Sequence, residues 1–248
     1  KVFPVALMLA SAGLSASTLE FRDGLDILLD GASTGVIYNS THDAELRASS
    51  PNNNFNYGTG SSDPEFTVDL VDGGGEAQVV LRFDDIFGAS GTHVPVGSII
   101  NSATLFIDID DKGSNLELYE LTSDFGAEST VSWSSFGGGV TPGGNAQSSL
   151  TTTINGGGNK VTIDITSSVA AWAAGAANYG WAFIATGSNG VDFDASENSD
   201  FADRPQLFVN FTAPAPAVVP LPPSMVLALP ALTFLMRARR RSNPATGG

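Results

Sequence analysis

The segment DFDASENSD, residues 192–200, brings four carboxylates close together in the chain. Asp192 and Asp194 alternate along a predicted strand and therefore share one face, and Glu197 follows in a loop. Clustered carboxylates repel one another unless a cation neutralises them, and Ca²⁺ takes about six to eight oxygen ligands. We therefore predict Asp192, Asp194 and Glu197 as candidate Ca²⁺ ligands.

A second acidic stretch, DIDDKGSN at residues 108–115, is similar to the start of an EF-hand loop. Lys112 stands at the fifth position of that loop, and Tyr119 stands at the twelfth, where a bidentate Glu is needed. The stretch is therefore not an EF-hand. A solvated hairpin turn is the favoured interpretation, and a local Ca²⁺ site that uses Asp108, Asp110 and Asn115 is the alternative.

Trp133 and Tyr57 are the aromatic residues that we expect to contact a sugar. An exposed ring offers an apolar platform on which a pyranose can stack. Trp133 follows a Val-Ser step, and Tyr57 lies beside Gly58 in an Asn-rich loop. Partial burial under a loop is the alternative for both rings, whereas Trp172 and Trp181 stand within apolar patterns and are predicted core residues.

The charge distribution excludes nucleic acid as a partner of the central part of the chain. All 26 Asp and Glu lie within residues 20–204, where six Lys and Arg oppose them, so this part carries a net charge of −20. Such a field repels phosphate backbones and favours cations. The absence of cysteine also excludes disulfides, thiolate zinc sites and a cysteine nucleophile.

No catalytic motif stands out among these acids. A glycosidase holds two carboxyl groups roughly 5–9 Å apart across a cleft, and in so acidic a chain some pair meets any spacing by chance. His42 and His93 are far apart in sequence and are expected on the surface or in loops. We therefore predict a non-catalytic protein, with a polysaccharide-degrading enzyme as the least favoured alternative.

Short strand patterns separated by Gly, Asn, Asp and Ser turns fill residues 18–212. The clearest predicted strands span 77–84, 98–110, 116–121, 160–166, 180–186 and 206–212. One short helix is expected after Ser167, with Val169 and Trp172 buried and Gly175 ending it. The pattern predicts an all-β fold, a single antiparallel β-sandwich whose end is covered by the helix.

Both ends of the chain differ from this central domain. Residues 1–17 begin with Lys, continue with an apolar stretch and end in small residues, which is typical of an export signal peptide. Residues 213–218, APAPAV, predict an extended linker. Residues 219–248 contain an apolar run that is short for a bilayer core of roughly 30 Å, followed by arginines. We expect a hydrophobic sorting helix in transient contact with the membrane, with a plain membrane anchor as the alternative.

Residues 219–248 resemble a PEP-CTERM bacterial sorting signal of the VPLPA type. The likeness rests on a Val-Pro-Leu-Pro signature, an apolar stretch and a terminal arginine cluster, although Pro223 replaces the Ala expected after the signature. The resemblance implies recognition and removal by an exosortase and delivery to the cell surface or the extracellular matrix. The signal residues are Val219, Pro220, Leu221, Pro222, Arg237, Arg239, Arg240 and Arg241.

The central part resembles a DNRLRE domain, a group that overlaps carbohydrate-binding module family 96 and disaggregatase-related proteins. The stretches that carry the likeness are 56–62, 76–88, 102–109, 167–183 and 188–211. The resemblance implies a non-catalytic β-sandwich of jelly-roll type at bacterial surfaces, with some relatives that bind acidic or plant polysaccharides. It also implies a structural pair between Glu197 and Arg204 that holds the last loop, as the alternative to calcium binding.

Together these features predict a secreted or surface-sorted bacterial protein that binds carbohydrate within an exopolysaccharide or biofilm matrix. The expected partners are extracellular polysaccharide, an exosortase during export and, transiently, the membrane. A domain of charge −20 is expected to bind anionic polysaccharide poorly unless Ca²⁺ bridges the two. The alternative is a purely structural surface or filament subunit that self-associates through an edge strand or an apolar patch.

Overall fold

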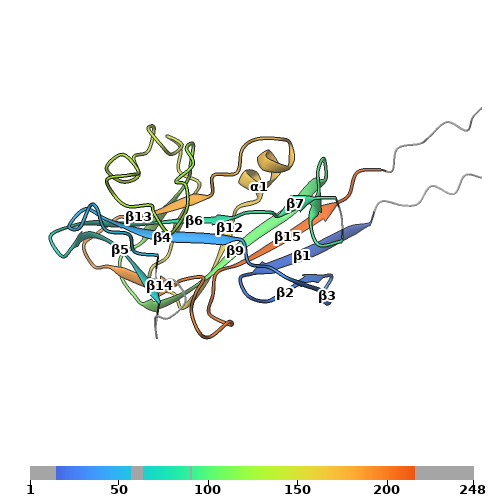
Figure 1. Cartoon of the computed structure of the whole chain (residues 1–248), viewed down its shortest axis with the longest axis horizontal. Helices are drawn as coiled ribbons and strands as arrows, with labels where there is room; N and C mark the ends of the chain where they lie inside the picture. The colour runs from blue at the N-terminus through green and yellow to red at the C-terminus, as the bar shows by residue number, and fades with distance from the viewer. Residues whose placement is uncertain (1–14, 57–63, 90, 216–248) are drawn as a thin grey trace, which may run out of the picture. The chain divides into compact units, whose positions relative to one another are not determined.

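A computed structural model describes residues 15–56, 64–89 and 91–215 of the chain (Figure 1). Tyr57 and the sorting residues from Val219 to Arg241 lie outside the described residues, as do most of the predicted signal peptide and part of the predicted linker. The described chain up to Pro214 belongs to one compact unit.

Strands dominate this unit. The strands of its first half are β1 (Ala16–Arg22), β2 (Asp26–Leu29), β3 (Ala32–Ile37), β4 (Thr41–Arg47), β5 (Glu65–Asp72), β6 (Gly75–Phe83), β7 (Phe87–Gly88) and β8 (Val94–Pro95). The later elements are β9 (Ile99–Asp111), β10 (Leu116–Glu120), β11 (Thr152–Ile154), β12 (Lys160–Asp164), α1 (Thr166–Ala173), β13 (Trp181–Ala185), β14 (Val191–Asp194) and β15 (Gln206–Thr212). All six strands predicted from the clearest patterns are confirmed, with bounds that differ by at most two residues.

The strands form two layers that are joined at one end (Figure 1). The first layer has the order β3-β2-β1-β15-β9-β12, and the second has the order β11-β10-β13-β6-β4. β5 forms a hairpin with β6 and also pairs with β14, which continues to β9 and so links the layers. All these pairings are antiparallel, and the small β7–β8 pair is parallel.

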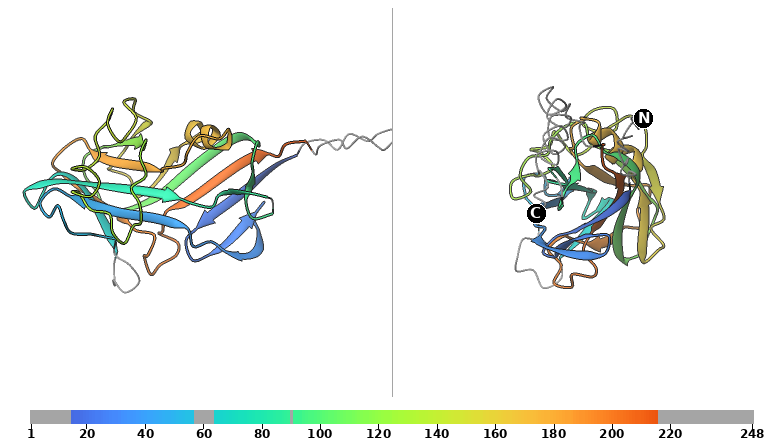
Figure 2. Two further views of the ribbon diagram at one scale, coloured as in Figure 1. Left: turned by 45° about the horizontal axis from the view of Figure 1, so that its top comes forward. Right: turned by 90° about the vertical axis from the view of Figure 1, so that its right-hand side faces the viewer.

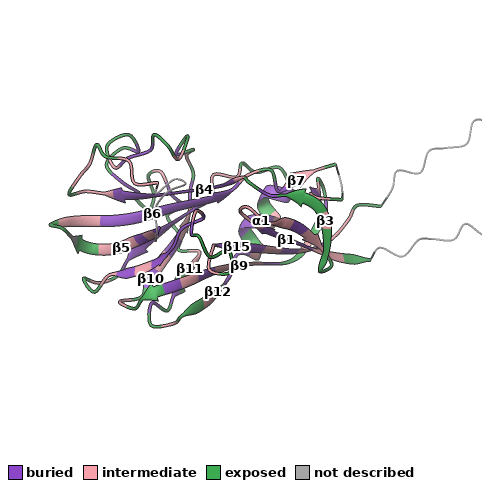
Figure 3. Ribbon diagram, turned by 60° about the horizontal axis from the view of Figure 1, so that its bottom comes forward, coloured by how far each residue is buried: buried purple, intermediate pink, exposed green. Residues whose placement is uncertain are grey.

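The main core lies between the two layers, because each strand turns alternate side chains inward. Leu105 and Leu207 of the first layer and Leu81 and Phe183 of the second are fully buried there. Figure 3 shows the resulting buried stretches along the central strands, and the end-on view of Figure 2 shows the strands placed around this interior.

Helix α1 joins the main core through Val169 and Trp172, as predicted. The Trp172 ring lies 4.8 Å from that of Trp181. Glu120 of β10 accepts hydrogen bonds from Ser168 Oγ at 2.6 Å and from Trp172 Nε1 at 3.1 Å, which fixes the helix to the second layer. The helix begins at Thr166, so the predicted start after Ser167 was slightly late.

A second core covers the outer face of the second layer. The long segment 121–151 folds over this face, seen at the upper left of Figure 1. It packs Phe125, Phe136 and Val140 on Val80 and on neighbouring residues of β4 and β13. The buried Gln78 side chain exchanges two hydrogen bonds with the backbone of Val140, at 2.6 and 3.1 Å, and holds the segment in place.

The predicted all-β class, the antiparallel pairing and the short helix are confirmed for the described residues. The jelly-roll connectivity stays a prediction. The helix found in this part of the chain has eight residues, and no helix in it has the length and apolar character that a membrane span requires.

Candidate functional site

The outer face of the first layer is open, in contrast to the covered face of the second. Strand register places Thr162, Phe106, Gln206 and Arg22 in one row across β12, β9, β15 and β1. Thr162 is exposed, and Phe106 and Arg22 are half-buried. Gln206 is buried between them. This face therefore combines side chains from four different segments of the sequence.

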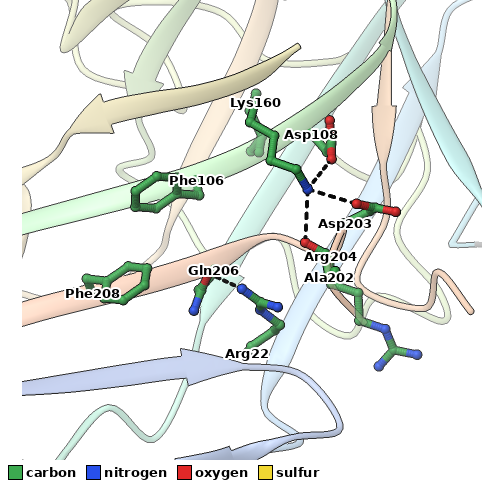
Figure 4. A pocket seen from close by; sticks show the side chains of 10 residues that line it. Arg22, Phe106, Asp108, Lys160, Ala202, Asp203, Arg204, Gln206 and Phe208 are labelled. Carbon is green, nitrogen blue, oxygen red and sulfur yellow. Dashed lines mark hydrogen bonds and ion pairs between the residues drawn. The ribbon is translucent and has the colours of Figure 1, made fainter. Parts of the chain in front are cut away.

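A pocket of about 230 Å³ lies on this face (Figure 4). Phe106 and Phe208, from the neighbouring strands β9 and β15, line its apolar side. Their ring centroids are 5.2 Å apart and the ring planes meet at 67°, an edge-to-face arrangement. Both rings are half-buried, so part of each aromatic surface faces the pocket.

Lys160 forms the charged side of the pocket with two aspartates. Its Nζ lies 2.5 Å from Asp108 Oδ2 and 2.8 Å from Asp203 Oδ1, and it donates to the carbonyl of Ala202 at 3.2 Å (Figure 4). The hydrogen bond from Lys160 lowers the pKa of Asp203. Burial raises the pKa of Asp108, although Lys160 opposes this shift. The three donors of the ammonium group are thus all engaged within the protein.

Arg22 lines the pocket beside Gln206. Its Nη1 donates to the carbonyl of Phe201 at 2.9 Å, its Nη2 donates to Gln206 Oε1, and its Nε is buried without a hydrogen-bond partner. Gln206 Nε2 in turn donates to Glu20 Oε1. Burial raises the pKa of Glu20, and Arg22 opposes this shift.

Arg204 also lines the pocket, but it does not form the predicted pair with Glu197. Its Nε donates to the carbonyl of Asn198 at 2.6 Å, and its Nη1 donates to the carbonyl of Asp23 at 2.9 Å and lies 3.8 Å from the carboxylate of Asp23. The guanidinium lies 4.2 Å from the ring centre of Phe201. Arg204 therefore does hold the last loop, through Asp23 and the backbone.

The three predicted calcium ligands do not form one group. Asp194 lies with Asp108 and Asp203 in what we call the β9 cluster, and Glu197 lies with Asp43 and Glu128 in what we call the β4 cluster. Asp192 belongs to neither group. The chain turns after β14, where Ser196 N bonds to Asp43, and this turn carries the Glu197 side chain toward β4.

Among the described residues, no Lys or Arg side chain lies within ion-pairing distance of the β4 cluster. Asp43 is buried and accepts hydrogen bonds from Ser196 N at 2.8 Å and from Ser196 Oγ at 3.1 Å. Burial raises the pKa of Asp43 and that of Glu197. Glu197 Oε2 is buried and has no hydrogen-bond partner. His42 Nδ1 lies 3.3 Å from Glu128 Oε2, and this contact raises the pKa of His42.

Trp133 is half-buried within the covering segment 121–151. Its ring packs against the second core, and a side chain on Gly139 would lie 2.6 Å from it. This position agrees with the alternative of partial burial under a loop. A sugar contact by Trp133 stays a prediction, as does one by Tyr57.

Sequence reasoning did not select Phe106, Phe208 or Lys160, although a signal was present. The alternation that turns Leu105 and Ile107 inward also turns Phe106 outward, on the face of Asp108. An aromatic residue on the polar face of a strand marks a possible binding surface. The position of Phe208 beside it depends on strand pairing, which the sequence pattern does not reveal.

The pocket thus places an aromatic pair beside hydrogen-bonding side chains on the open face of a two-layered β fold. The model of carbohydrate-binding module family 96 matches residues 36–211, and the chain belongs to this family. The match includes most of the strands and both phenylalanines of the pocket. A comparison with curated proteins found no match.

Proposed function

We propose that the protein is a non-catalytic carbohydrate-binding protein and that glycan binds on the outer face of the first layer, at the Phe106–Phe208 pocket. The observation that carries this assignment is the half-exposed aromatic pair next to the polar side chains of Lys160 and Asp203. A pyranose presents C–H groups on its faces and hydroxyl groups at its edge. The C–H groups can pack on the aromatic rings, and the hydroxyl groups can form hydrogen bonds with the polar side chains.

The carboxylates of the pocket do not suit a glycosidase. The acid and base of such an enzyme lie roughly 5–9 Å apart, on opposite sides of the bond that is cleaved. Oxygens of Asp108 and Asp203 lie within 4.8 Å of each other, and both contact the same ammonium of Lys160. Two carboxylates that are this close together and share one ammonium leave no room for a glycosidic bond between them, which supports binding without hydrolysis.

Affinity electrophoresis of the full chain through gels that contain neutral or acidic polysaccharides tests the proposal. We expect retardation on at least one glycan, lost in Phe106→Ala and in Phe208→Ala but kept in Phe55→Ala, which removes a half-buried ring next to Arg47. Trp133→Ala separates this site from the one predicted from the sequence. Retardation that survives loss of the pocket rings would contradict the site, and folded protein that no gel retards would contradict the function.

Calcium binding is the second part of the proposal, and the β4 cluster supports it better than the β9 cluster. Lys160 already supplies positive charge to the β9 cluster. The β4 cluster holds the buried, unpartnered Glu197 Oε2, and its carboxylate oxygens lie within 4.8 Å of one another. Carboxylate oxygens are the ligands that Ca²⁺ prefers. The proposed ligand set keeps Glu197 and adds Asp43 and Glu128.

The proposal places the protein outside a bacterial cell, in the exopolysaccharide or biofilm matrix. Its support is the resemblance of residues 1–17 to an export signal, of 219–248 to a PEP-CTERM tail and of the central part to a DNRLRE domain. An exosortase then acts on the tail during export, while the tail contacts the membrane transiently.

A self-associating structural subunit is the second candidate function, and the edge strand β3 favours it. β3 ends the strand order of the first layer, and its Val36 and Ile37 are 44% and 51% exposed. An exposed apolar edge offers unpaired backbone groups to another strand. Concentration-dependent association without retardation on any glycan gel would favour this function.

A further inference from the structure

A second pocket lies where the edges of the two layers meet, and we call it the edge pocket. Its volume is about 480 Å³. Strand β12 ends the first layer, β11 ends the second, and these two edge strands contact each other (Figure 3). The residues that line the edge pocket come from both layers and from α1: Thr151, Thr152, Asp164, Thr166, Ser167 and Ala170.

Three hydroxyl groups of the edge pocket are available to a ligand. Within the described part of the chain, the side-chain hydroxyls of Thr151, Thr152 and Ser167 have no hydrogen-bond partner. The two threonines are half-buried, and Ser167 is exposed. A hydroxyl group can donate one hydrogen bond and accept two. The edge pocket therefore offers several donors and acceptors that the protein itself does not use.

Asp164 adds an exposed carboxylate to these hydroxyls. Its Oδ1 accepts hydrogen bonds from Thr166 N at 2.9 Å and from Thr166 Oγ1 at 2.6 Å, and these bonds lower the pKa of Asp164. The other carboxylate oxygen stays available as an acceptor. A single carboxylate offers few charged oxygens to Ca²⁺, whereas hydroxyls beside an acceptor match the hydroxyl groups of a sugar.

The outward side chains of β12 connect the edge pocket to the Phe106–Phe208 pocket. Lys160, Thr162 and Asp164 alternate along this strand and share its outer side. Lys160 lines the Phe106–Phe208 pocket, and Asp164 lines the edge pocket. Thr162 lies exposed between them, opposite Phe106. At a rise of about 3.3 Å per residue, the Cα atoms of Lys160 and Asp164 are about 13 Å apart.

We infer that the edge pocket is a second sugar-binding site and that one glycan chain runs along β12 through both pockets. This inference rests on the proposed function, because it extends the proposed site from one pocket to two. One sugar unit packs on Phe106 and Phe208, and a unit further along the same chain forms hydrogen bonds with Asp164 and the free hydroxyls. The ligand is therefore a chain of several sugar units rather than a single sugar.

Binding measured against the length of the glycan tests the inference. The probes are size-fractionated oligosaccharides, from the disaccharide to the octasaccharide, prepared from the polysaccharide that retards the full chain in gels. Isothermal titration calorimetry in EDTA measures their affinities without bridging by Ca²⁺. We expect the affinity of the native chain to rise with length until one molecule spans both pockets, and then to level off.

A double variant removes two hydrogen-bonding groups from the edge pocket alone. Thr152→Val/Ser167→Ala should weaken the binding of the longest oligosaccharides about tenfold, because two hydrogen bonds to the sugar are lost. It should leave the affinity for the shortest oligosaccharide that binds unchanged. Thr153→Val is the matched control, since Thr153 is exposed on the same strand and does not line the edge pocket. This control should change neither affinity.

The outcomes separate the inference from the function on which it rests. Long oligosaccharides that bind the double variant as tightly as the native chain overturn the second sugar-binding site, and so does an equal loss of affinity at every length. Neither result affects the proposed Phe106–Phe208 pocket, which Phe106→Ala tests separately. Folded native protein that no polysaccharide retards overturns both.

Discussion

Asp194 lies next to Asp108 and Asp203, the two aspartates that line the pocket. It is 7% exposed, its Oδ1 accepts a hydrogen bond from Asn198 Nδ2, and it shares the β9 cluster with Asp108 and Asp203. Burial raises the pKa of Asp194 to about 7, although the Asn198 hydrogen bond opposes the shift. The side chain is therefore largely protonated in mildly acidic solution.

This pKa predicts a pH-dependent stability. Between the ordinary Asp value of 3.8 and about 7, the folded state holds a proton on Asp194 that the unfolded chain has released. The folded state binds more protons in this interval, so the free energy of unfolding falls as the pH rises through it. Asp194→Asn keeps the acceptor for Asn198 and should flatten this part of the curve.

Urea denaturation at several pH values between 4 and 8, a range set roughly by these pKa values, measures the effect. The exposed Asp110→Asn serves as the control and should leave the slope unchanged. An identical slope for native protein and Asp194→Asn would mean that Asp194 does not titrate in this range.

At the scale of elements, close approach between backbones determines where the chain can turn. Gly180 lies directly before β13, with φ +77°, and a Cβ placed there would lie 2.2 Å from the carbonyl oxygen of Leu81 in β6. Its own carbonyl accepts a hydrogen bond from Leu121 N at 2.9 Å, where the covering segment begins. Because Gly180 has no side chain, β13 can pack beside β6. The hydrogen bond from Leu121 N to Gly180 also fixes the beginning of segment 121–151, which covers the second layer.

We predict that Gly180→Ala lowers the free energy of unfolding by about 3 kcal/mol, from left-handed backbone strain together with displacement of β6. Gly35→Ala is the matched control, because Gly35 has a similar φ of +73° with nothing within 4 Å of its added Cβ. Gly35→Ala should lower the free energy of unfolding by about 1 kcal/mol, from backbone strain alone. Equal losses in urea denaturation would show that the contact with Leu81 contributes nothing.

At the scale of the whole molecule, like-charge repulsion opposes the compact state. A net charge of −20 on the central part is screened by salt within roughly 10 Å at 0.1 M ionic strength, so the unfolding temperature should rise with added NaCl. A specific calcium site adds to this general effect.

We expect CaCl₂ to raise the unfolding temperature more than NaCl does at equal ionic strength, by about 4–8 °C if the site contributes roughly 2 kcal/mol. Glu128→Gln removes one proposed ligand from the covering segment and should abolish the excess while keeping the response to NaCl. Asp203→Asn, in the β9 cluster, should keep both the response to NaCl and the additional rise with CaCl₂. Differential scanning fluorimetry measures these shifts, and equal responses of the native chain to both salts would exclude the calcium site.

The sequence by itself determined the class of fold, the inward face of most strands, the helix and the acidic character. These are properties of short stretches: alternation along KVTIDIT places Val161 and Ile163 inward whichever strand lies beside it. Motif resemblance also indicated the carbohydrate-binding family. The predicted pair between Glu197 and Arg204 was wrong. Arg204 contacts Asp23 instead, and the turn after β14 directs the Glu197 side chain toward Asp43 and away from Arg204.

Only the tertiary structure decided which of these stretches meet. Phe106 and Phe208, or Lys160 and Asp108, become neighbours because β9 pairs with β15 on one side and with β12 on the other. Strand pairing depends on packing and register between distant segments, which no local pattern encodes. For the same reason the acidic run 192–200 was divided between two clusters, since the direction of each carboxylate follows from the strand that lies opposite it.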